Sequence, residues 1–285
     1  MSGAPRTLGL CADDFGLWPS VSRAIARLAR AQRLTVVSCI TTGDAWRASA
    51  PLLADLPDSV EVGLHFNLTE GLPLSAELAR AWPVLPSLPS LIVRAHLRQL
   101  PLEALRAEWQ AQVAAFTEAT GRVPRTVDGH QHVHHLPQVR EVVLQGIGQL
   151  LPAPAVRDTG CLPGPGFALK RHLIAGTGGR WLHRELVTRG WLHNPALLGV
   201  YDFADTDYRA WMQRWLRALP AAGGLVFCHP GEIDAQSAGD AIAPARQREL
   251  AYLESGAFAD DLAAADVTLG RVWQRGEATK RSSAG

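Results

Sequence analysis

The sequence predicts an α/β fold with parallel strands, in a single domain that forms a distorted (β/α) TIM-like barrel. Short apolar runs alternate with longer segments whose apolar residues recur at helical spacing, and this alternation is typical of βαβ units. The runs provide about seven strands, close to the eight of a closed barrel. We expect one further strand in the weakly patterned residues 160–220. A doubly wound open sheet is the alternative.

The order of the runs and of the helical segments defines the predicted elements. The apolar runs place strands at residues 7–12, 35–40, 59–64, 125–128, 155–157, 224–228 and 266–269. Helical spacing places helices at 20–32, 45–56, 102–120 and 137–151. Residues 70–100 are rich in Pro and lack a clear period, which indicates an extended insertion or a lid. We place the barrel domain at 1–276 and a flexible tail at 277–285.

Composition excludes several classes of protein. The 28 Lys and Arg residues nearly balance 27 Asp and Glu residues, so there is no basic surplus of the kind that nucleic-acid binding needs. Apolar runs are far shorter than a membrane span of roughly 20 residues. No apolar stretch typical of a secretory signal follows the first Met, so we expect none, and the four cysteines are widely separated. We therefore expect a cytoplasmic protein with reduced thiols.

Polar residues interrupt the pattern where the predicted strands end. Asp13 and Asp14 follow the first strand, His65 the third, His130 the fourth, and His229 the strand at 224–228. In a parallel barrel the carboxyl ends of all strands open on one face, where active sites are built. The sequence therefore predicts that carboxylates and imidazoles from separate elements meet at one rim.

The Asp13–Asp14 pair suits two tasks at once. Neighbouring residues that leave a strand point in opposite directions, so one can ligate a metal while the other faces the substrate as a base. One Asp with two His suits a divalent ion that also holds water and substrate, and zinc, manganese, cobalt and iron all accept these donors. For a pair of Asp residues alone, a turn or a helix cap is the competing interpretation.

The segment DGHQHVHH holds four of the ten histidines. In an extended backbone His130, His132 and His134 share one side, whereas in a helical turn only His130 and His134 do. A site that already contains an Asp and His65 needs one or two more ligands, so the other rings become partners of ligands or substrate contacts. An adventitious metal patch is the alternative interpretation.

Three further residues complete the predicted site. Pro230 fixes the backbone after His229, and an unperturbed pKa near ~6.5 makes this imidazole the natural acid for a leaving amine. Arg157 follows a short strand and either contacts substrate, orients the first aspartate or forms a surface ion pair. Asn67 is either a substrate contact or a turn residue. We assign Arg157, Asn67 and His132 to substrate binding.

Four segments in order, ADDFG, GLHFNLTEG, DGHQHVH and CHPGE, together resemble the YdjC-like family, also called the chitooligosaccharide or carbohydrate deacetylase family. The resemblance spans roughly residues 8–272. It implies a distorted (β/α) barrel and a hydrolase that removes acetate from an N-acetylated sugar. The sugar would be a chitooligosaccharide or a related N-acetylglucosaminyl glycan or glycolipid. The resemblance also implies a homodimer.

The same resemblance implies a role for each site residue. The metal ligands fall on Asp14, His65 and His130, the base falls on Asp13, and the acid falls on His229. The implied cofactor is one divalent metal ion, which is Zn, Mg, Mn or Co.

Two other functions use the same residues. One is a different metal-dependent barrel hydrolase or isomerase acting on sugars, and the other is a catalytically inactive carbohydrate-binding homologue. The sequence contains no GxGxxG after the first strand, no GxxxxGK[ST], no HExxH and no GxSxG. Nucleotide-dependent transfer and serine hydrolysis therefore have no motif in their favour.

Overall fold

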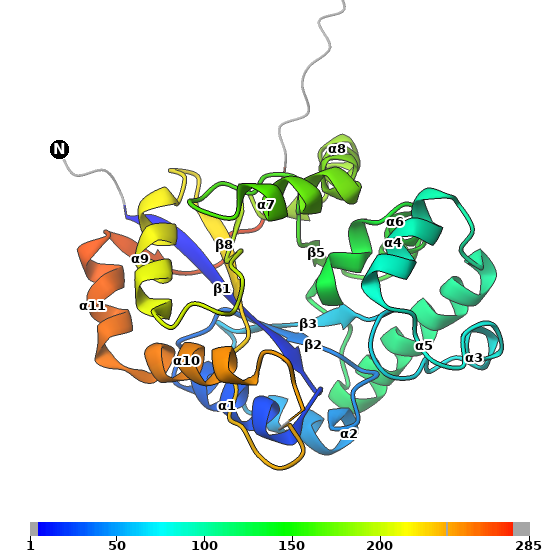
Figure 1. Ribbon diagram of the computed structural model, residues 1–285, viewed down its shortest axis with the longest axis horizontal. Coiled ribbons are helices and arrows are strands. Elements are labelled where there is room, and N and C mark those ends of the chain that lie inside the picture. Colours follow the sequence, from blue (N-terminus) through cyan, green and yellow to red (C-terminus); the bar gives the residue numbers. More distant parts are fainter. Residues whose placement is uncertain (1–4, 238, 276–285) are drawn as a thin grey trace, which may run out of the picture.

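The computed structural model describes residues 5–237 and 239–275, and its strands run through the middle of the molecule with helices around them (Figure 1). The described strands are β1 (Arg6–Phe15), β2 (Val36–Cys39), β3 (Glu61–Phe66), β4 (Thr126–Gly129), β5 (Ala155–Val156), β6 (Leu192–His193), β7 (Leu197–Leu198), β8 (Gly224–Cys228), β9 (Val267–Leu269) and β10 (Gln274–Arg275). They form one sheet with the order β10-β6-β5-β4-β3-β2-β1-β8-β7, and β9 also pairs with β1. The predicted tail at 277–285 lies outside the described residues.

The sheet is a curled half-barrel. Neighbouring strands are parallel, except that β10 and β6 are antiparallel. Within the described residues no pairing joins β7 to β10, so the sheet does not close. The predicted distorted (β/α) barrel with parallel strands is confirmed in this open form. Residues 160–220 contribute two strands of two residues each, not the single strand that we expected.

Helices surround the sheet on its outer side (Figure 1). They are α1 (Pro19–Arg30), α2 (Trp46–Ser49), α3 (Ala76–Ala81), α4 (Leu88–His96), α5 (Leu102–Thr120), α6 (Val139–Ile147), α7 (Ala168–Ile174), α8 (Arg180–Arg189), α9 (Tyr208–Ala218), α10 (Ala243–Glu254) and α11 (Gly256–Ala264), with the short helical segments η1 (Ala50–Leu53), η2 (His130–His135) and η3 (Ala175–Gly179). No helix of the described residues is both long and apolar enough to cross a membrane.

Two predicted segments differ from the structure. Residues 70–100 are not an extended insertion, because they form α3 and α4, and α3 packs against α5. Helices of six and nine residues are too short to show a clear hydrophobic period. The helix predicted at 45–56 is α2 followed by the tighter η1. Pro51 has no N–H to donate, so it cannot continue an α-helix that began at Trp46.

Strand β1 is longer than predicted and irregular at its end. It continues through Asp13 and Asp14 to Phe15, so the expectation that it stops at Asp13 is wrong. Its pairing with β2 shifts in register between Ala12 and Phe15, and Asp14 lies in this shift with a φ of 69°. Irregular strand ends with left-handed residues redirect side chains and are frequent beside active sites.

The register of β3 and β4 places two polar side chains opposite each other. His65 and Asp128 are direct partners in this parallel pair. Close approach of the two strands depends on Gly63, because a Cβ atom there would overlap both the side chain and the backbone carbonyl of Thr126. This glycine is therefore needed for the pairing that aligns His65 with Asp128.

We predict that Gly63→Ala destabilises the protein by about 1–3 kcal/mol, because the added methyl group must push apart two backbones in the middle of the sheet. Urea unfolding measures the change. Gly256→Ala is the matched control, since a Cβ atom at that helical position meets nothing within 4 Å. Equal stability of Gly63→Ala and the wild type would show that this approach is not tight.

Candidate active site

A cavity of about 560 Å³ opens where β1, β3, β4 and β8 end. Its wall carries three aromatic side chains, Trp18, Phe203 and Phe227. The ionisable side chains on the wall are Asp13, Asp14, His65, Glu70, His130, His132, Lys170, His229, Asp240 and Arg246. Six of the eight residues that we predicted from the sequence therefore share one cavity, and Arg157 and Asn67 do not lie on its wall.

Asp14, His65 and His130 form the most compact group of metal-ligating atoms in the cavity. Each offers one donor atom, and the three atoms lie within 4.8 Å of one another. Asp14 Oδ1 is 3.4 Å from His65 Nε2 and 3.0 Å from His130 Nδ1. All three residues are buried. One carboxylate oxygen and two imidazole nitrogens in this arrangement are compatible with a divalent metal ion.

A second layer of hydrogen bonds orients the His65 ring. Its Nδ1 is 2.6 Å from Asp128 Oδ1, which also accepts a hydrogen bond of 2.5 Å from the hydroxyl of Ser38. The carboxylate holds the proton on Nδ1, so Nε2 faces Asp14 as the ligating nitrogen. Such carboxylate–histidine pairs fix the tautomer and orientation of metal ligands. The sequence analysis did not single out Asp128 or Ser38.

Arg246 stabilises the charge on Asp14 from the opposite side. Its Nη2 donates a 2.7 Å hydrogen bond to Asp14 Oδ2, and its Nε is 2.5 Å from Asp240 Oδ2. Burial opposes ionisation of Asp14, but Arg246 and His130 outweigh burial and hold the pKa of this carboxyl well below its usual range. Asp14 therefore remains a carboxylate, with Oδ1 turned toward the histidines.

Without a bound cation, the neighbouring carboxylates favour a proton on both His65 and His130. Burial disfavours a charged ring at His65, but Asp128 and Asp13 outweigh it and raise the pKa of His65 to about 10. Burial likewise opposes the charge on His130, yet Asp14 raises its pKa. A cation bound by the three donors would replace these protons and meet the same negative charge.

Glu70 is a residue of the site that sequence reasoning left unassigned. Its Oε2 lies 2.9 Å from His130 Nε2, while its side chain is 44% exposed. Asn67 holds it in place. The amide of Asn67 donates to the Glu70 carbonyl at 2.6 Å and accepts from the backbone N–H groups of Thr69 and Glu70. The buried Asn67 thus forms the turn that presents Glu70 to the cavity.

Asp13 belongs to a separate buried cluster centred on Arg157. The guanidinium donates to both oxygens of Asp13, at 2.7 and 2.6 Å, and lies 2.5 Å from Asp128 Oδ2 and 3.0 Å from Cys11 Sγ. Donor atoms of Cys11, Asp13 and Asp128 also lie within 4.8 Å of one another. The guanidinium of Arg157 contacts all three of these residues, so its positive charge takes the position that a metal ion would need.

His229 lies beside Asp13, with its Nε2 4.0 Å from Asp13 Oδ2. Its ring contacts the rings of Phe203 and Phe227 edge-on. Burial lowers the pKa of His229 to about 4, against the raising effect of Asp14 and Asp13. Its backbone N–H donates to Glu249, whose other oxygen accepts from the hydroxyl of Tyr201. Nδ1 of this ring has no hydrogen-bond partner in the described part of the chain.

The remaining histidines of DGHQHVHH divide into two kinds. His132 has a φ of 62° and lines the cavity, and its buried Nδ1 has no partner among the residues described. His134 instead donates through Nε2 to the Arg157 carbonyl at 2.9 Å. His135 contacts the hydroxyls of Thr159 and Thr177. His134 and His135 therefore make their hydrogen bonds within the protein and not toward the cavity.

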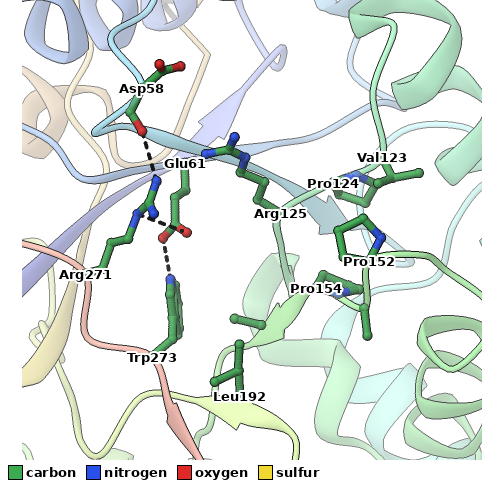
Figure 2. Close-up of a pocket in the computed structure, with 12 residues that line it drawn as sticks. Asp58, Glu61, Val123, Pro124, Arg125, Pro152, Pro154, Leu192, Arg271 and Trp273 are labelled. Atoms are coloured by element: carbon green, nitrogen blue, oxygen red, sulfur yellow. Dashed lines mark hydrogen bonds and ion pairs between the residues drawn. The ribbon is translucent and has the colours of Figure 1, made fainter.

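A second cavity, of about 480 Å³, lies at the opposite ends of β3, β4 and β5 (Figure 2). Trp273 and Arg271 reach Glu61 there, and Arg271 also donates to the backbone carbonyl of Asp58. Its described lining residues include no histidine and no cysteine. Six of the eight predicted site residues thus meet in the first cavity, at the carboxyl ends of the strands.

Comparison with known proteins finds relatives that are named as deacetylases. A "Carbohydrate deacetylase" of Xenopus laevis is 36% identical over 152 residues, which are 51% of this chain and 49% of that protein. A "Chitooligosaccharide deacetylase" of Escherichia fergusonii is 29% identical over 280 residues, covering 93% and 97% of the two chains. The match therefore spans about half the length of the vertebrate relatives and nearly all of the bacterial one.

A solved structure and a family profile extend the comparison to most of the chain. The structure is that of an Enterococcus faecalis V583 protein named for cellobiose-phosphate cleavage, and it matches 94% of this chain and 98% of its own with a TM-score of 0.71. At 18% identity it supports the fold alone. The profile of the YdjC-like proteins matches residues 7–264, which include every predicted site residue. The chain belongs to the YdjC-like protein family.

Proposed function

We propose that the protein is a metal-dependent carbohydrate N-deacetylase, which hydrolyses the acetamide of an N-acetylated sugar to a free amine and acetate. One observation carries this proposal. The cavity holds an Asp–His–His group of metal-ligating atoms directly beside a second carboxylate and a histidine, Asp13 and His229. The deacetylase names of the relatives support the same reaction class and the same kind of substrate.

In this proposal Asp14, His65 and His130 hold one divalent ion, which is zinc, magnesium, manganese or cobalt. When bound, such an ion supplies Lewis-acid chemistry that acidifies water and polarises an amide carbonyl. The carboxylate of Glu70 is partly exposed and contacts His130. Its negative charge would help to balance the positive charge of the ion.

Asp13 and His229 move the protons. Asp13 accepts a proton from the attacking water, and the new C–O bond converts the amide carbonyl into a tetrahedral oxyanion. Arg157 binds both Asp13 oxygens and so fixes the carboxylate in one orientation. His229 Nε2 then donates a proton to the amine nitrogen as the C–N bond breaks, and acetate leaves. Because a pKa of about 4 leaves this ring neutral in the free protein, it first takes the water-derived proton from Asp13, 4.0 Å away, once negative charge has formed on the intermediate, and Asp13 returns to its carboxylate form.

The rest of the cavity suits a sugar. Trp18, Phe203 and Phe227 provide aromatic surface for the apolar side of a pyranose ring. His132 lines the same cavity, and its buried Nδ1 has no partner in the described residues. We propose that His132 contacts the substrate. The sequence analysis assigned Arg157 and Asn67 to substrate binding. In this proposal neither contacts the substrate: Arg157 orients Asp13, and Asn67 positions Glu70. The homodimer and the cytoplasmic location stay predictions.

The direct test is acetate release. Metal-stripped protein, alone and with added zinc, magnesium, manganese or cobalt, is incubated with N-acetylglucosamine, chitooligosaccharides and an N-acetylglucosaminyl lipid. We expect acetate and free amine in equal amounts, only with metal. Conversion of a sugar or sugar phosphate without acetate would indicate a different metal-dependent hydrolase or isomerase. Sugar binding with neither metal nor turnover would indicate a carbohydrate-binding homologue.

Asp13→Asn should reduce kcat by about 10²–10⁴-fold, because an amide cannot accept the proton from water. Metal content should stay at the wild-type value, since Asp13 is not among the ligating atoms of the Asp14 group. Asp58→Asn, in the second cavity, is the control variant. A wild-type rate in Asp13→Asn would refute its assignment as the base.

The stability of the metal-stripped protein should fall as the pH rises from 6.5 through about 10. The folded-state pKa of His65 lies above the ordinary value of 6.5, so its contribution is complete below pH 6.5 and is lost as the pH passes about 10. Urea unfolding across this range should show a flatter profile for His65→Gln than for the wild type. His96→Gln, on exposed α4, is the control and should follow the wild type; parallel wild-type and His65→Gln profiles would contradict the assignment.

A further inference from the structure

A second group of metal-ligating atoms lies outside the cavity. Asp158 follows β5, His193 lies in β6 and His183 lies in α8, and one donor atom from each lies within 4.8 Å of the other two. The group therefore joins two neighbouring strands of the sheet to a helix that covers it. None of these residues takes part in the reaction proposed above.

Two of the donors are already oriented by hydrogen bonds to the backbone. Asp158 Oδ1 accepts a 2.7 Å hydrogen bond from the N–H of Gly160, which leaves Oδ2 toward His183 Nδ1 at 2.5 Å. His193 Nδ1 donates to the Trp191 carbonyl at 2.8 Å, so the lone pair of this ring is on Nε2. Among the described residues the ring's hydrogen bond is the one made by Nδ1, and His193 as a whole is 3% exposed. An imidazole whose second nitrogen donates to a backbone carbonyl is the common form of a metal-ligating histidine.

The backbone around the group is held tightly. Asn194, next to His193, accepts from the Asp158 N–H at 2.8 Å and donates to the Asp158 carbonyl at 3.0 Å. On the other side, a Cβ atom at Gly160 would come within 2.6 Å of His183 Cβ, so only glycine lets α8 approach this closely. The three ligating residues are thus fixed from both sides before any ion arrives.

The group is also open to solvent. The side chain of His183 is 43% exposed, whereas that of Asp158 is 1% exposed. An ion can therefore enter past His183 and keep water in its remaining positions. One carboxylate oxygen with two imidazole nitrogens favours zinc and similar transition ions over magnesium or calcium, which prefer oxygen.

We propose that Asp158, His183 and His193 form a second metal site, which binds Zn²⁺ and has a structural role. The ion replaces the proton between His183 and Asp158 and links α8 to the ends of β5 and β6. The linked segment is the one that carries Arg157 and Thr159, which contact Asp13 and His135. The site thereby stabilises the backbone behind the catalytic cavity without contacting the substrate. The proposal does not depend on the proposed reaction.

Zinc stoichiometry tests the proposal. The full-length, metal-stripped protein is dialysed against chelator-buffered Zn²⁺, and bound zinc is measured by elemental analysis. The variants are His183→Gln, which alters a half-exposed side chain, Asp158→Asn, and His65→Gln for the first site. His172→Gln is the matched control, because His172 is a histidine of the neighbouring α7 whose Nδ1 contacts only the Ala168 carbonyl among the described residues. Circular dichroism confirms that each variant is folded.

We expect His183→Gln and Asp158→Asn each to bind one zinc ion fewer than the wild type, with His172→Gln unchanged. His65→Gln should retain the ion that His183→Gln loses, and Zn²⁺ should raise its unfolding temperature. That rise should disappear when His65→Gln and His183→Gln are combined. Equal zinc in His183→Gln and the wild type, or an equal loss in His172→Gln, would overturn the proposal and leave Asp158–His183 as an ordinary ion pair. Loss of zinc only in His65→Gln would do the same while leaving the proposed deacetylase intact.

Discussion

The structure around the cavity depends on the neutralisation of three carboxylates that are buried almost completely. Asp13, Asp14 and Asp128 are at most 3% exposed, and each contacts a buried arginine, either Arg157 or Arg246. A buried charge without a partner costs several kcal/mol, so neither arginine is dispensable to the fold. Two guanidinium groups cannot balance three carboxylates, and the remaining charge draws a proton or a cation to the imidazoles between them. Affinity for a cation is therefore a consequence of how the fold buries its acids.

The sequence predicts those elements of the fold that extend over enough residues to show an apolar run or a helical period. Residues 8–12 and 224–228 carry no polar or charged side chain, and the structure places β1 and β8 there. Strands β6 and β7 have two residues each, which is too short for any period, so the number of strands in 160–220 was wrong. The curling of the sheet is a property of the strand order, which pairs β1 with β8, and no local pattern reports it.

The candidate site could be predicted to the extent that its residues stand next to strands. Asp13, Asp14, His65, His130 and His229 do so, and they share one cavity. Arg246 could not be found in this way, because it lies 232 residues from Asp14, on a helix, where a charged residue usually faces solvent. Asn67 has a polar side chain of the kind that often contacts a substrate, yet this side chain makes its hydrogen bonds to the backbone of the turn that follows it. Polar residues near a site support its ligands as often as they form it, and a sequence does not distinguish the two.

The position of β1 in the sheet has a consequence for how the protein is made. This strand is the first of the described strands along the chain, but it pairs with β8 and β9, which follow six or more other described strands. A growing chain on the ribosome therefore carries a buried strand that lacks two of its neighbours until β8 and β9 have been synthesised. Pairings across such long separations slow folding and expose the strand to chaperones or to aggregation in the meantime. The pocket containing Asp14 consequently cannot be completed before β8 has been synthesised and has paired with β1.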